Sequence, residues 1–532
     1  MNLFYNTKKT QQTSINPSSR HCRVGISVLI AVFSLLGVHN KVMASEQVSP
    51  FATRAFHITF RPQSQPPAFY QRVIDQASEL GYNTLILHTG GMGAASFTMP
   101  TPGEVRFHKW TNKQVANLLD YAKNAGLEPI CDVKIIGKHK AFLSQLAAKH
   151  PGLLRPGKYG VMNPSYHFPN GQDAYDAIEL PMLDFFIGLY GDTKPRYLLL
   201  GTDEISVAEL EFCAKQMKTT VPKMFAKLIN RCTKHLIDQG ITPIIWGDML
   251  LGRQLGKPGH GIVGFDHDPR IKGGHATFFS KQKNTSGTLT AMNHLTHRDK
   301  IIVADWHYGA PPSGEYPSVD YFQAMKFKDV WGTTWYNDDG IRAFTRYAAK
   351  RHCGGMIATA WHTSISPAVS HLFKPLLHNS AVYFRNPEFS PPKAALSYRL
   401  TPTQEDAAVT AATEKQSGVF LKSAKTLSYQ VQLPKGYTPA TGATLQLHTP
   451  KTKKTATKLT FDPSTHSLTG LIALKPGKGK LPHTYNTILR WVDQDSGYMS
   501  QIYNASHFNV TPRVPAKAGE PDTTAWFAAD FS

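Results

Sequence analysis

Eight short apolar runs of β-strand character, separated by stretches long enough to form helices, constrain the fold of this chain more than any other feature. Most of the runs are apolar at nearly every position. A strand that is apolar throughout is typical of a parallel sheet with both faces buried. The runs are residues 55–60, 83–89, 128–133, 197–201, 243–246, 301–305, 330–335 and 356–361.

The segments between these runs have the periodicity of helices. Residues 113–125 and 222–239, for example, are apolar at positions i, i+3 and i+4. Several segments end in a glycine just before the next run, as at Gly81, Gly126 and Gly240, and glycine commonly ends helices. A count of eight favours a closed barrel over an open doubly wound sheet, and no GxGxxG motif follows the first run. We therefore predict an α/β fold, a (β/α)8 TIM barrel, over residues 45–390.

The pattern changes after residue 391. Polar and apolar residues alternate in short runs, and turns rich in Pro, Gly, Lys and Ser divide these runs. This pattern predicts a small antiparallel β-sandwich over residues 391–510, followed by a loose C-terminal tail over residues 511–532. The clearest alternating runs are residues 427–433, 443–448, 487–492 and 502–510.

The N-terminal 44 residues have the layout of a secretory signal peptide. Four basic residues precede an apolar run at residues 24–38, and Val42-Met43-Ala44 forms a small-residue cleavage site. The apolar run is short for a membrane span, although an uncleaved membrane anchor is the alternative. We therefore predict an exported protein, periplasmic or secreted, with no membrane span in the mature chain.

The chain is strongly basic, with 58 Lys and Arg against 37 Asp and Glu and a formal net charge of +21. Nucleic acid is the usual partner of such a protein, but the export signal argues against it. Much of the excess lies at residues 451–458 and 474–480. These segments suit acidic envelope glycans, and a solvated basic face is an equal alternative.

Cysteine usage gives no disulfide framework and no metal motif. Cys131, Cys213, Cys232 and Cys353 follow the signal peptide, and none of them stands in a CxxC pair. Pairing between Cys213 and Cys232 is left open. No HxH or HExxH spacing is present either, so the sequence indicates no metal site.

Carboxylates and tryptophans dominate the positions at which the predicted strands end, where barrels of this class carry their functional groups. Aromatic faces pack against sugar rings, and carboxylates bind hydroxyls and supply acid–base chemistry, so the set favours a carbohydrate ligand. Packing in the barrel core is the alternative for each tryptophan. The expected substrate-binding residues are Arg61, Trp246, Asp248, Asp305, Trp306, Trp335, Tyr336 and Trp361.

The most specific element is the pair Asp203-Glu204, which follows the fourth run after the single residue Thr202. Two adjacent acids at a strand end can place one carboxylate in a pocket while the other steers it, so both are predicted to be catalytic. The alternative is that Asp203 caps the following helix and Glu204 fills its first turn. His88 and His139 are interpreted as structural histidines.

These residues resemble motifs of glycoside hydrolase family 20, the β-N-acetylhexosaminidases. Residues 197–204 are similar to the family's fourth-strand motif, which ends in His-x-Gly-Gly-Asp-Glu, with Leu199 and Thr202 in place of the histidine and the second glycine. The resemblance extends over residues 55–380. The other similar segments are Phe60-Arg61, Asp132 with Gly137 and His139, Trp246-Gly247-Asp248, Tyr336-Asn337-Asp338, and Gly354-Gly355 with Trp361. Tyr308 is the alternative to Tyr336 as the tyrosine of the pocket.

The resemblance implies hydrolysis of a carbohydrate that ends in an N-acetylhexosamine. In this family the substrate's own 2-acetamido oxygen attacks the anomeric carbon, and no cofactor takes part. Glu204 would protonate the leaving oxygen and then deprotonate water, while Asp203 would orient the acetamido group and stabilise the developing positive charge.

Two alternatives to this function stay open at the level of sequence. One is a glycosidase that uses two of its own carboxylates, with Asp248 or Asp305 as the second acid. The other is a catalytically silent glycan-binding protein of the envelope, which the altered fourth-strand motif and the basic C-terminal region both allow.

Overall fold

The computed structural model describes the chain in separate ranges. These are residues 48–90, 96–155, 160–205, 207–251, 287–361 and 372–391, together with the C-terminal strands given below and the turns at 463–466 and 496–498. The predicted signal peptide, the basic segment at 474–480 and most of the predicted tail lie outside these ranges. No helix among the described residues is long and apolar enough to cross a membrane.

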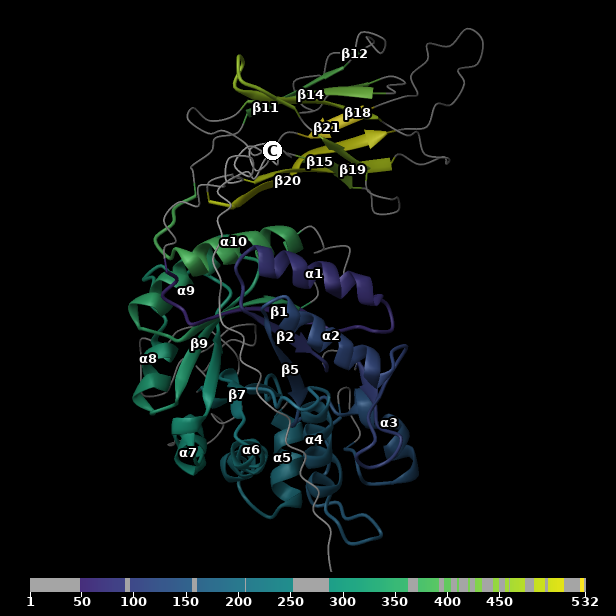
Figure 1. Ribbon diagram of the computed structural model, residues 1–532, viewed down its shortest axis with the longest axis vertical. Coiled ribbons are helices and arrows are strands. Elements are labelled where there is room, and N and C mark those ends of the chain that lie inside the picture. The colour runs from purple at the N-terminus through teal and green to yellow at the C-terminus, as the bar shows by residue number, and fades with distance from the viewer. Residues whose placement is uncertain are drawn as a thin grey trace, which may run out of the picture. The chain divides into compact units, whose positions relative to one another are not determined.

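Eight parallel strands close into a barrel, as the spacing of the apolar runs predicts (Figure 1). Each strand lies between its neighbours in chain order, and the last pairs with the first: β1 and β10 are in register from Thr53 opposite Gly355. The observed strands match the predicted runs to within two residues at each end. They are β1 (Thr53–Thr59), β2 (Thr84–His88), β5 (Glu128–Lys134), β6 (Tyr197–Gly201), β7 (Thr242–Trp246), β8 (Ile302–Trp306), β9 (Asp329–Thr334) and β10 (Gly355–Ala360).

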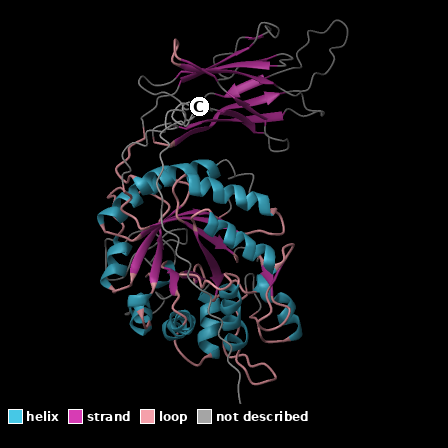
Figure 2. Cartoon of the chain, viewed as in Figure 1, coloured by secondary structure: helices cyan, strands magenta, loops and turns pink. Residues whose placement is uncertain are grey.

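Helices surround the barrel and cover the outer face of its strands (Figure 2). Gly81, Gly126 and Gly240 follow α1, α2 and α6 with φ angles of +84°, +80° and +79°, a conformation that favours glycine at helix ends. The helices are α1 (Pro67–Glu79), α2 (Asn112–Asn124), α3 (Lys140–Lys149), α4 (Leu180–Gly188), α5 (Val207–Gln216), α6 (Val221–Asp238), α7 (Gly287–His294), α8 (Pro317–Ala324), α9 (Asp338–Lys350) and α10 (Phe373–Arg385). Short helical turns and a hairpin complete this part: η1 (Tyr175–Glu179), η2 (Asp248–Leu250), η4 (Arg298–Lys300), β3 (Phe97–Thr98) and β4 (Arg106–Phe107).

Two apolar clusters hold the barrel together. The larger one packs the outer faces of the strands against the helices, and the smaller one fills the interior of the barrel. The interior cluster contains an inward-facing side chain from each of the eight strands, which makes this barrel a packed core and not a pore. Those residues are Ala55, Ile86, Ile130, Leu199, Ile244, Ile302, Trp331 and Ile357.

The C-terminal part consists of antiparallel strands, as the alternating pattern predicts. They form a four-stranded sheet in the order β11-β14-β18-β17, a five-stranded sheet in the order β16-β15-β19-β20-β21, and the short pair β12-β13. That the two larger sheets stack as a sandwich remains a prediction. The strands are β11 (Ser397–Pro402), β12 (Val409–Thr410), β13 (Phe420–Leu421), β14 (Thr426–Gln432), β15 (Thr444–His448), β16 (Thr455–Lys458), β17 (Thr460–Asp462), β18 (Ser467–Ala473), β19 (His483–Val492), β20 (Met499–Val510) and β21 (Phe527–Asp530).

Two further expectations can be compared with the structure. The segment after residue 511, expected to be loose, contains the strand β21, which pairs with β20. The four cysteines after the predicted signal peptide are all buried free thiols. The pairing of Cys213 with Cys232, which the sequence left open, is therefore not formed.

Candidate active site

The residues of the site follow from the two-residue repeat of the strands. Side chains two positions after these interior residues also point into the barrel, nearer the carboxyl ends of their strands. In the neighbouring strands β5, β6 and β7 these positions are Asp132, Gly201 and Trp246. One further step along β5 reaches Lys134, at the end of that strand.

Asp203 lies at the centre of a buried ion cluster. One carboxylate oxygen is bound by the Lys134 ammonium, and the other lies 3.0 Å from Nζ of Lys138. Burial opposes ionisation of Asp203, but the two lysines outweigh it and hold the pKa of this carboxyl well below its usual range. Because α5 begins only at Val207 and both Asp203 oxygens bind lysines, the arrangement is not the helix cap that was the alternative.

Gly201 makes room for this cluster. A Cβ atom at position 201 would lie 2.9 Å from Nζ and 3.0 Å from Cε of Lys134, both too close for ordinary contact. Gly90, which follows β2, is also close, at 3.1 Å from Cγ of Lys134 for the same hypothetical atom. The lysine therefore reaches Asp203 through a space that two glycines leave open.

Glu204 turns its side chain away from the packed interior. Its carboxylate lies 3.6 Å from Nζ of Lys138, and its side chain is 40% exposed against 10% for Asp203. Glu204 and Lys138 both have left-handed backbones, with φ angles of +50° and +56°. The other non-glycine residues of this kind in the described ranges lie in turns after helices or between strands, whereas these two follow barrel strands. Left-handed backbone is strained for residues with a Cβ atom, and such strain often accompanies function.

Asp248 is the third carboxyl group of the cluster. Oδ2 of Asp248 accepts a hydrogen bond from the backbone N–H of Glu204 at 3.1 Å. The side chain is fully buried, and burial together with the negative charges of Asp203 and Glu204 raises the pKa of Asp248 to about 7. Asp203 and Asp248 therefore differ in protonation at neutral pH: Asp203 is ionised, whereas Asp248 retains its proton to a large extent.

Aromatic rings from four strand ends form a continuous group. The ring centroids of Trp246 and Trp361 are 5.5 Å apart, and Nε1–H of Trp361 donates to the Tyr308 hydroxyl at 2.9 Å. Tyr308 stacks on Trp306 at 4.8 Å and contacts Trp335 at 5.2 Å. The backbone carbonyl of Trp246 also accepts from Thr202, the neighbour of Asp203, at 3.3 Å, which joins the aromatic group to the carboxylate cluster.

Of the two tyrosines considered for the pocket, Tyr308 lies near the carboxylate cluster, and which of them serves as the pocket tyrosine stays a prediction. The negative charges of Asp203 and Glu204 contribute, after burial, to raising the pKa of the Tyr308 hydroxyl, so these groups are close together. Tyr336 contacts Trp335 but is 38% exposed. The segment after Tyr336 has a structural role: Asn337 caps α9, and Asp338 accepts hydrogen bonds from Asn379 and two tyrosines.

Two other expected site residues, Asp305 and Arg61, differ in their surroundings. Asp305 is fully buried, accepts from Ser318 at 2.6 Å and lies 3.3 Å from Nε2 of His307. The guanidinium of Arg61 has a buried Nε without a hydrogen-bond partner among the described residues, and desolvation lowers the pKa of Arg61. The part of Arg61 and Asp305 in substrate binding therefore stays a prediction.

The histidines divide into two kinds. His139 is structural, as predicted: Nδ1 accepts from the backbone of Met162, and Nε2 lies 2.8 Å from the buried carboxylate of Glu179. His88 is different, because its ring contacts Trp361 and its Nδ1–H donates to Asp132 at 2.5 Å. Burial lowers the pKa of His88 to about 4 despite the neighbouring Asp132.

Lys134 and Lys138 are the functional candidates that sequence reasoning missed. A signal for Lys134 was present: within β5, Ile130, Asp132 and Lys134 alternate with apolar residues, so all three face the interior. A lysine at an interior position must find a carboxylate. No comparable pattern marks Lys138, which lies in the loop after β5.

Comparison with known proteins gives matches at the level of solved structures. No protein-family profile and no curated protein sequence matches the chain. Similar solved structures include the tandem catalytic modules of the pneumococcal exo-β-D-N-acetylglucosaminidase, with 14% identity, a TM-score of 0.40, and coverage of 63% of this chain and 83% of that one. The exo-β-N-acetylglucosaminidase of Vibrio harveyi is 11% identical with a TM-score of 0.42, covering 63% of this chain and 54% of its own.

A third similar structure is the chitobiase of Flavobacterium johnsoniae. It is 14% identical with a TM-score of 0.43, and the match covers 63% of this chain and 48% of the chitobiase. All three proteins are glycoside hydrolase family 20 enzymes. That is the family which the strand-end motifs resemble. The chain spans about half the length of the Vibrio and Flavobacterium enzymes.

Proposed function

We propose that this protein is a glycoside hydrolase that cleaves a terminal N-acetylhexosamine from a carbohydrate. The observation that carries the proposal is the group of three carboxyl side chains, Asp203, Glu204 and Asp248, near the partly exposed, hydrogen-bonded rings of Tyr308 and Trp361 at the strand ends of the barrel. A sugar ring needs flat apolar surface for its C–H faces, and its hydrolysis needs acid–base groups next to that surface.

In this proposal Glu204 acts as general acid and then as general base. Its side chain is partly exposed, so its carboxyl can meet both the glycosidic oxygen and an incoming water. The attacking group is the substrate's own acetamido oxygen, which forms a bicyclic oxazolinium ion. The proton on Glu204 passes to the leaving oxygen as the glycosidic bond breaks. Water then opens the oxazolinium ion and returns a proton to Glu204.

Asp203 would orient the acetamido group and stabilise the positive charge of the oxazolinium ion. The low pKa that the lysines impose keeps this carboxylate ionised across the physiological range. Each oxygen of Asp203 binds one lysine, and a carboxylate has about four acceptor positions. An acceptor position therefore remains for the acetamido N–H. The lysines reduce the net negative charge available to the oxazolinium ion, which is the principal difference from an unpaired aspartate.

One observation favours a second candidate, a glycosidase that uses two enzyme carboxylates. The pKa of Asp248, about 7, is that of a group able to donate a proton at neutral pH. In this scheme Asp248 would protonate the leaving oxygen, and Glu204 would serve as nucleophile or base. Between Asp248 and Asp305, the two residues considered for this role, Asp248 is the one in contact with the Asp203-Glu204 segment.

The test uses pairs of chromogenic glycosides with and without a 2-acetamido group, together with a thiazoline that mimics the oxazolinium ion. We expect turnover only of the acetamido sugars and inhibition by the thiazoline. Glu204→Gln should slow substrates with poor leaving groups most, because activated leaving groups need little protonation. Asp203→Asn should slow both kinds and weaken thiazoline binding.

The matched control is Glu104→Gln, which removes an exposed surface carboxylate paired with Arg106 and should leave both rates unchanged. Equal turnover with and without the acetamido group, with no inhibition by the thiazoline, would establish the two-carboxylate candidate instead. No turnover of any glycoside by the purified mature chain, with the thiazoline still bound, would identify a catalytically silent glycan-binding protein.

A further inference from the structure

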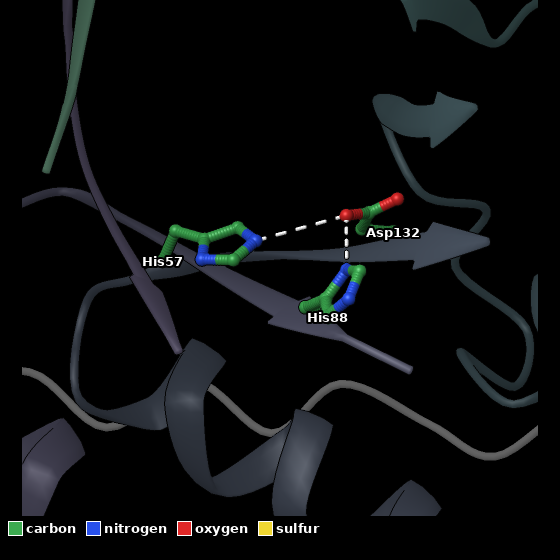
Figure 3. A group of neighbouring side chains, drawn as sticks. All are labelled: His57, His88 and Asp132. Atoms are coloured by element: carbon green, nitrogen blue, oxygen red, sulfur yellow. Dashed lines mark hydrogen bonds and ion pairs between the residues drawn. The ribbon is translucent and has the colours of Figure 1, made fainter. Parts of the chain in front are cut away.

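A second polar cluster lies inside the barrel, on three neighbouring strands. His57 is in β1, His88 is in β2 and Asp132 is in β5, and their side chains converge on one point (Figure 3). Each follows an interior residue by two positions, namely Ala55, Ile86 and Ile130, so the strand repeat directs all three inward. The proposed hydrolysis uses none of these three side chains.

The contacts within this cluster leave several polar atoms without partners. Nδ1 of His88 is 2.5 Å from Oδ2 of Asp132, and Nε2 of His57 is 3.7 Å from the same oxygen. Neither ring nitrogen of His57 has a hydrogen-bond partner among the described residues, and nor does Oδ1 of Asp132. His57 and Asp132 are fully buried, and His88 is 3% exposed. Buried polar atoms normally have partners, so the cluster is built to bind something further.

The chemistry of these atoms matches that of a transition-metal site. Two imidazoles and one carboxylate are a common ligand set for Zn²⁺ and other divalent first-row ions. The three ligand atoms lie within 4.8 Å of one another. Bonds of about 2.0–2.1 Å in a tetrahedral zinc site place ligand atoms roughly 3.4 Å apart. The observed separations of 2.5 Å and 3.7 Å fall on either side of that value, so small side-chain rotations would suffice.

We propose that His57, His88 and Asp132 bind a divalent transition-metal ion, with Zn²⁺ as the preferred ion. The ion would replace the proton between His88 and Asp132 and would give a partner to the unsatisfied His57 imidazole. The nearest cation along β5, Lys134, is bound to Asp203, so its charge is largely compensated. The ligands come from three strands far apart in the sequence, which explains why no short motif indicates the site.

The surroundings indicate a structural ion. The Trp361 ring contacts both imidazoles, tilted against His57 at a centroid distance of 4.3 Å and edge-on to His88 at 5.0 Å. Trp246 contacts His57 from another side at 6.1 Å. The ion would therefore lie beside these aromatic rings, where it would cross-link β1, β2 and β5. The proposal is independent of whether the protein hydrolyses glycosides.

The experiment is zinc titration of the purified mature chain after removal of metals with a chelator. We expect isothermal calorimetry to give one tight Zn²⁺ site per chain, and Zn²⁺ to raise the melting temperature. His57→Asn removes one ligand, and Asp132→Asn keeps the shape of its side chain while losing its charge. Each should weaken binding at least tenfold. The control is His235→Asn, which removes a surface histidine that pairs with Asp184 and should leave this site unchanged.

A second measurement keeps the proposal testable should either variant fail to fold. Co²⁺ added to the metal-free wild type should give the visible absorption bands of a low-coordinate site with nitrogen ligands, and Zn²⁺ should displace it. Absence of these bands would overturn the proposal. So would zinc affinity that His57→Asn and Asp132→Asn leave unchanged, because binding would then take place at other groups of the chain.

Discussion

Two carboxyl groups of one cluster at the strand ends of this barrel differ in their charge state. Two lysines hold Asp203 ionised. Asp248 accepts a hydrogen bond from the backbone of Glu204, the residue next to Asp203, and has a pKa of about 7. The difference arises from the neighbouring charges: Lys134 and Lys138 each bind an oxygen of Asp203, whereas Asp248 lies near the negative charges of Asp203 and Glu204. One small cluster therefore contains a permanent anion and a group that titrates near neutrality.

The raised pKa of Asp248 predicts how stability depends on pH. An unfolded chain releases this proton near pH 3.8, the ordinary value, but the folded chain retains it to about pH 7. Between these values the unfolded state binds fewer protons, so the contribution of Asp248 to the free energy of unfolding falls as pH rises. Asp248→Asn mimics the neutral form and removes this cost. The free energy of unfolding of the variant should equal that of the wild type near pH 4 and exceed it by a few kcal/mol at pH 8.

Urea unfolding at both pH values, followed by tryptophan fluorescence, measures this difference. The low-pH comparison serves as the internal control, because both proteins are neutral at position 248 there. A constant difference between the two proteins across the pH range would show that Asp248 titrates normally in the folded state.

Single elements explain why these side chains meet. The fourth barrel strand, β6, ends in Gly201, whose missing side chain leaves the space that Lys134 of β5 occupies. The two strands are in register with Lys134 opposite Gly201. The ion cluster thus depends on a pairing between a large and a small residue on adjacent strands as much as on charge.

Gly201→Ala should therefore destabilise the barrel by about 1–3 kcal/mol and displace Lys134 from Asp203. In a Lys134→Ala background, Gly201→Ala should destabilise the barrel much less, because the side chain that the new Cβ atom would meet is gone. Thermal unfolding of the two single variants and the double variant measures this coupling. Gly188→Ala is the control, since a Cβ atom there would meet nothing within 4 Å. Strictly additive effects would mean that Gly201 does not serve to accommodate Lys134.

The elements also show what sequence could and could not predict. The barrel was predictable because a strand buried on both faces is apolar throughout, and eight such runs with helical spacers leave few other folds. The Asp203-Glu204 pair was predictable because it comes just after the end of a strand. The lysine partners of Asp203 were not, since which side chain fills the space above a glycine depends on strand register. Asp305, likewise, has a strand-end position, but its carboxylate binds Ser318.

At the scale of the whole molecule, the chain combines a barrel with a strand-rich C-terminal part and a basic charge excess. The buried cysteines are consistent with either a reducing or an oxidising compartment, because none is paired and each thiol is shielded by packing. The location of the protein therefore rests on its N-terminal sequence, which has the order of regions found in secretory signals.

We predict that export removes residues 1–44 and that the mature chain begins at Ser45. Mass spectrometry of the protein recovered after expression with its native N-terminus would identify the first residue. The Ala44→Arg variant should remain uncleaved, because it lacks the small residue at the cleavage site. Recovery of the wild-type chain with Met1 still present, in the membrane fraction, would instead identify the N-terminal segment as an anchor.

The left-handed backbone at Glu204 and Lys138 determines how this protein would change if variants were selected for thermal stability alone. Each residue has a backbone angle that a glycine adopts without strain, at a penalty of about 1–2 kcal/mol for a residue with a side chain. Random variants screened only for thermal stability should therefore accumulate glycine or asparagine at these two positions. A trade-off between thermal stability and function is thus concentrated in Glu204 and Lys138, two neighbouring side chains at the strand ends of the barrel.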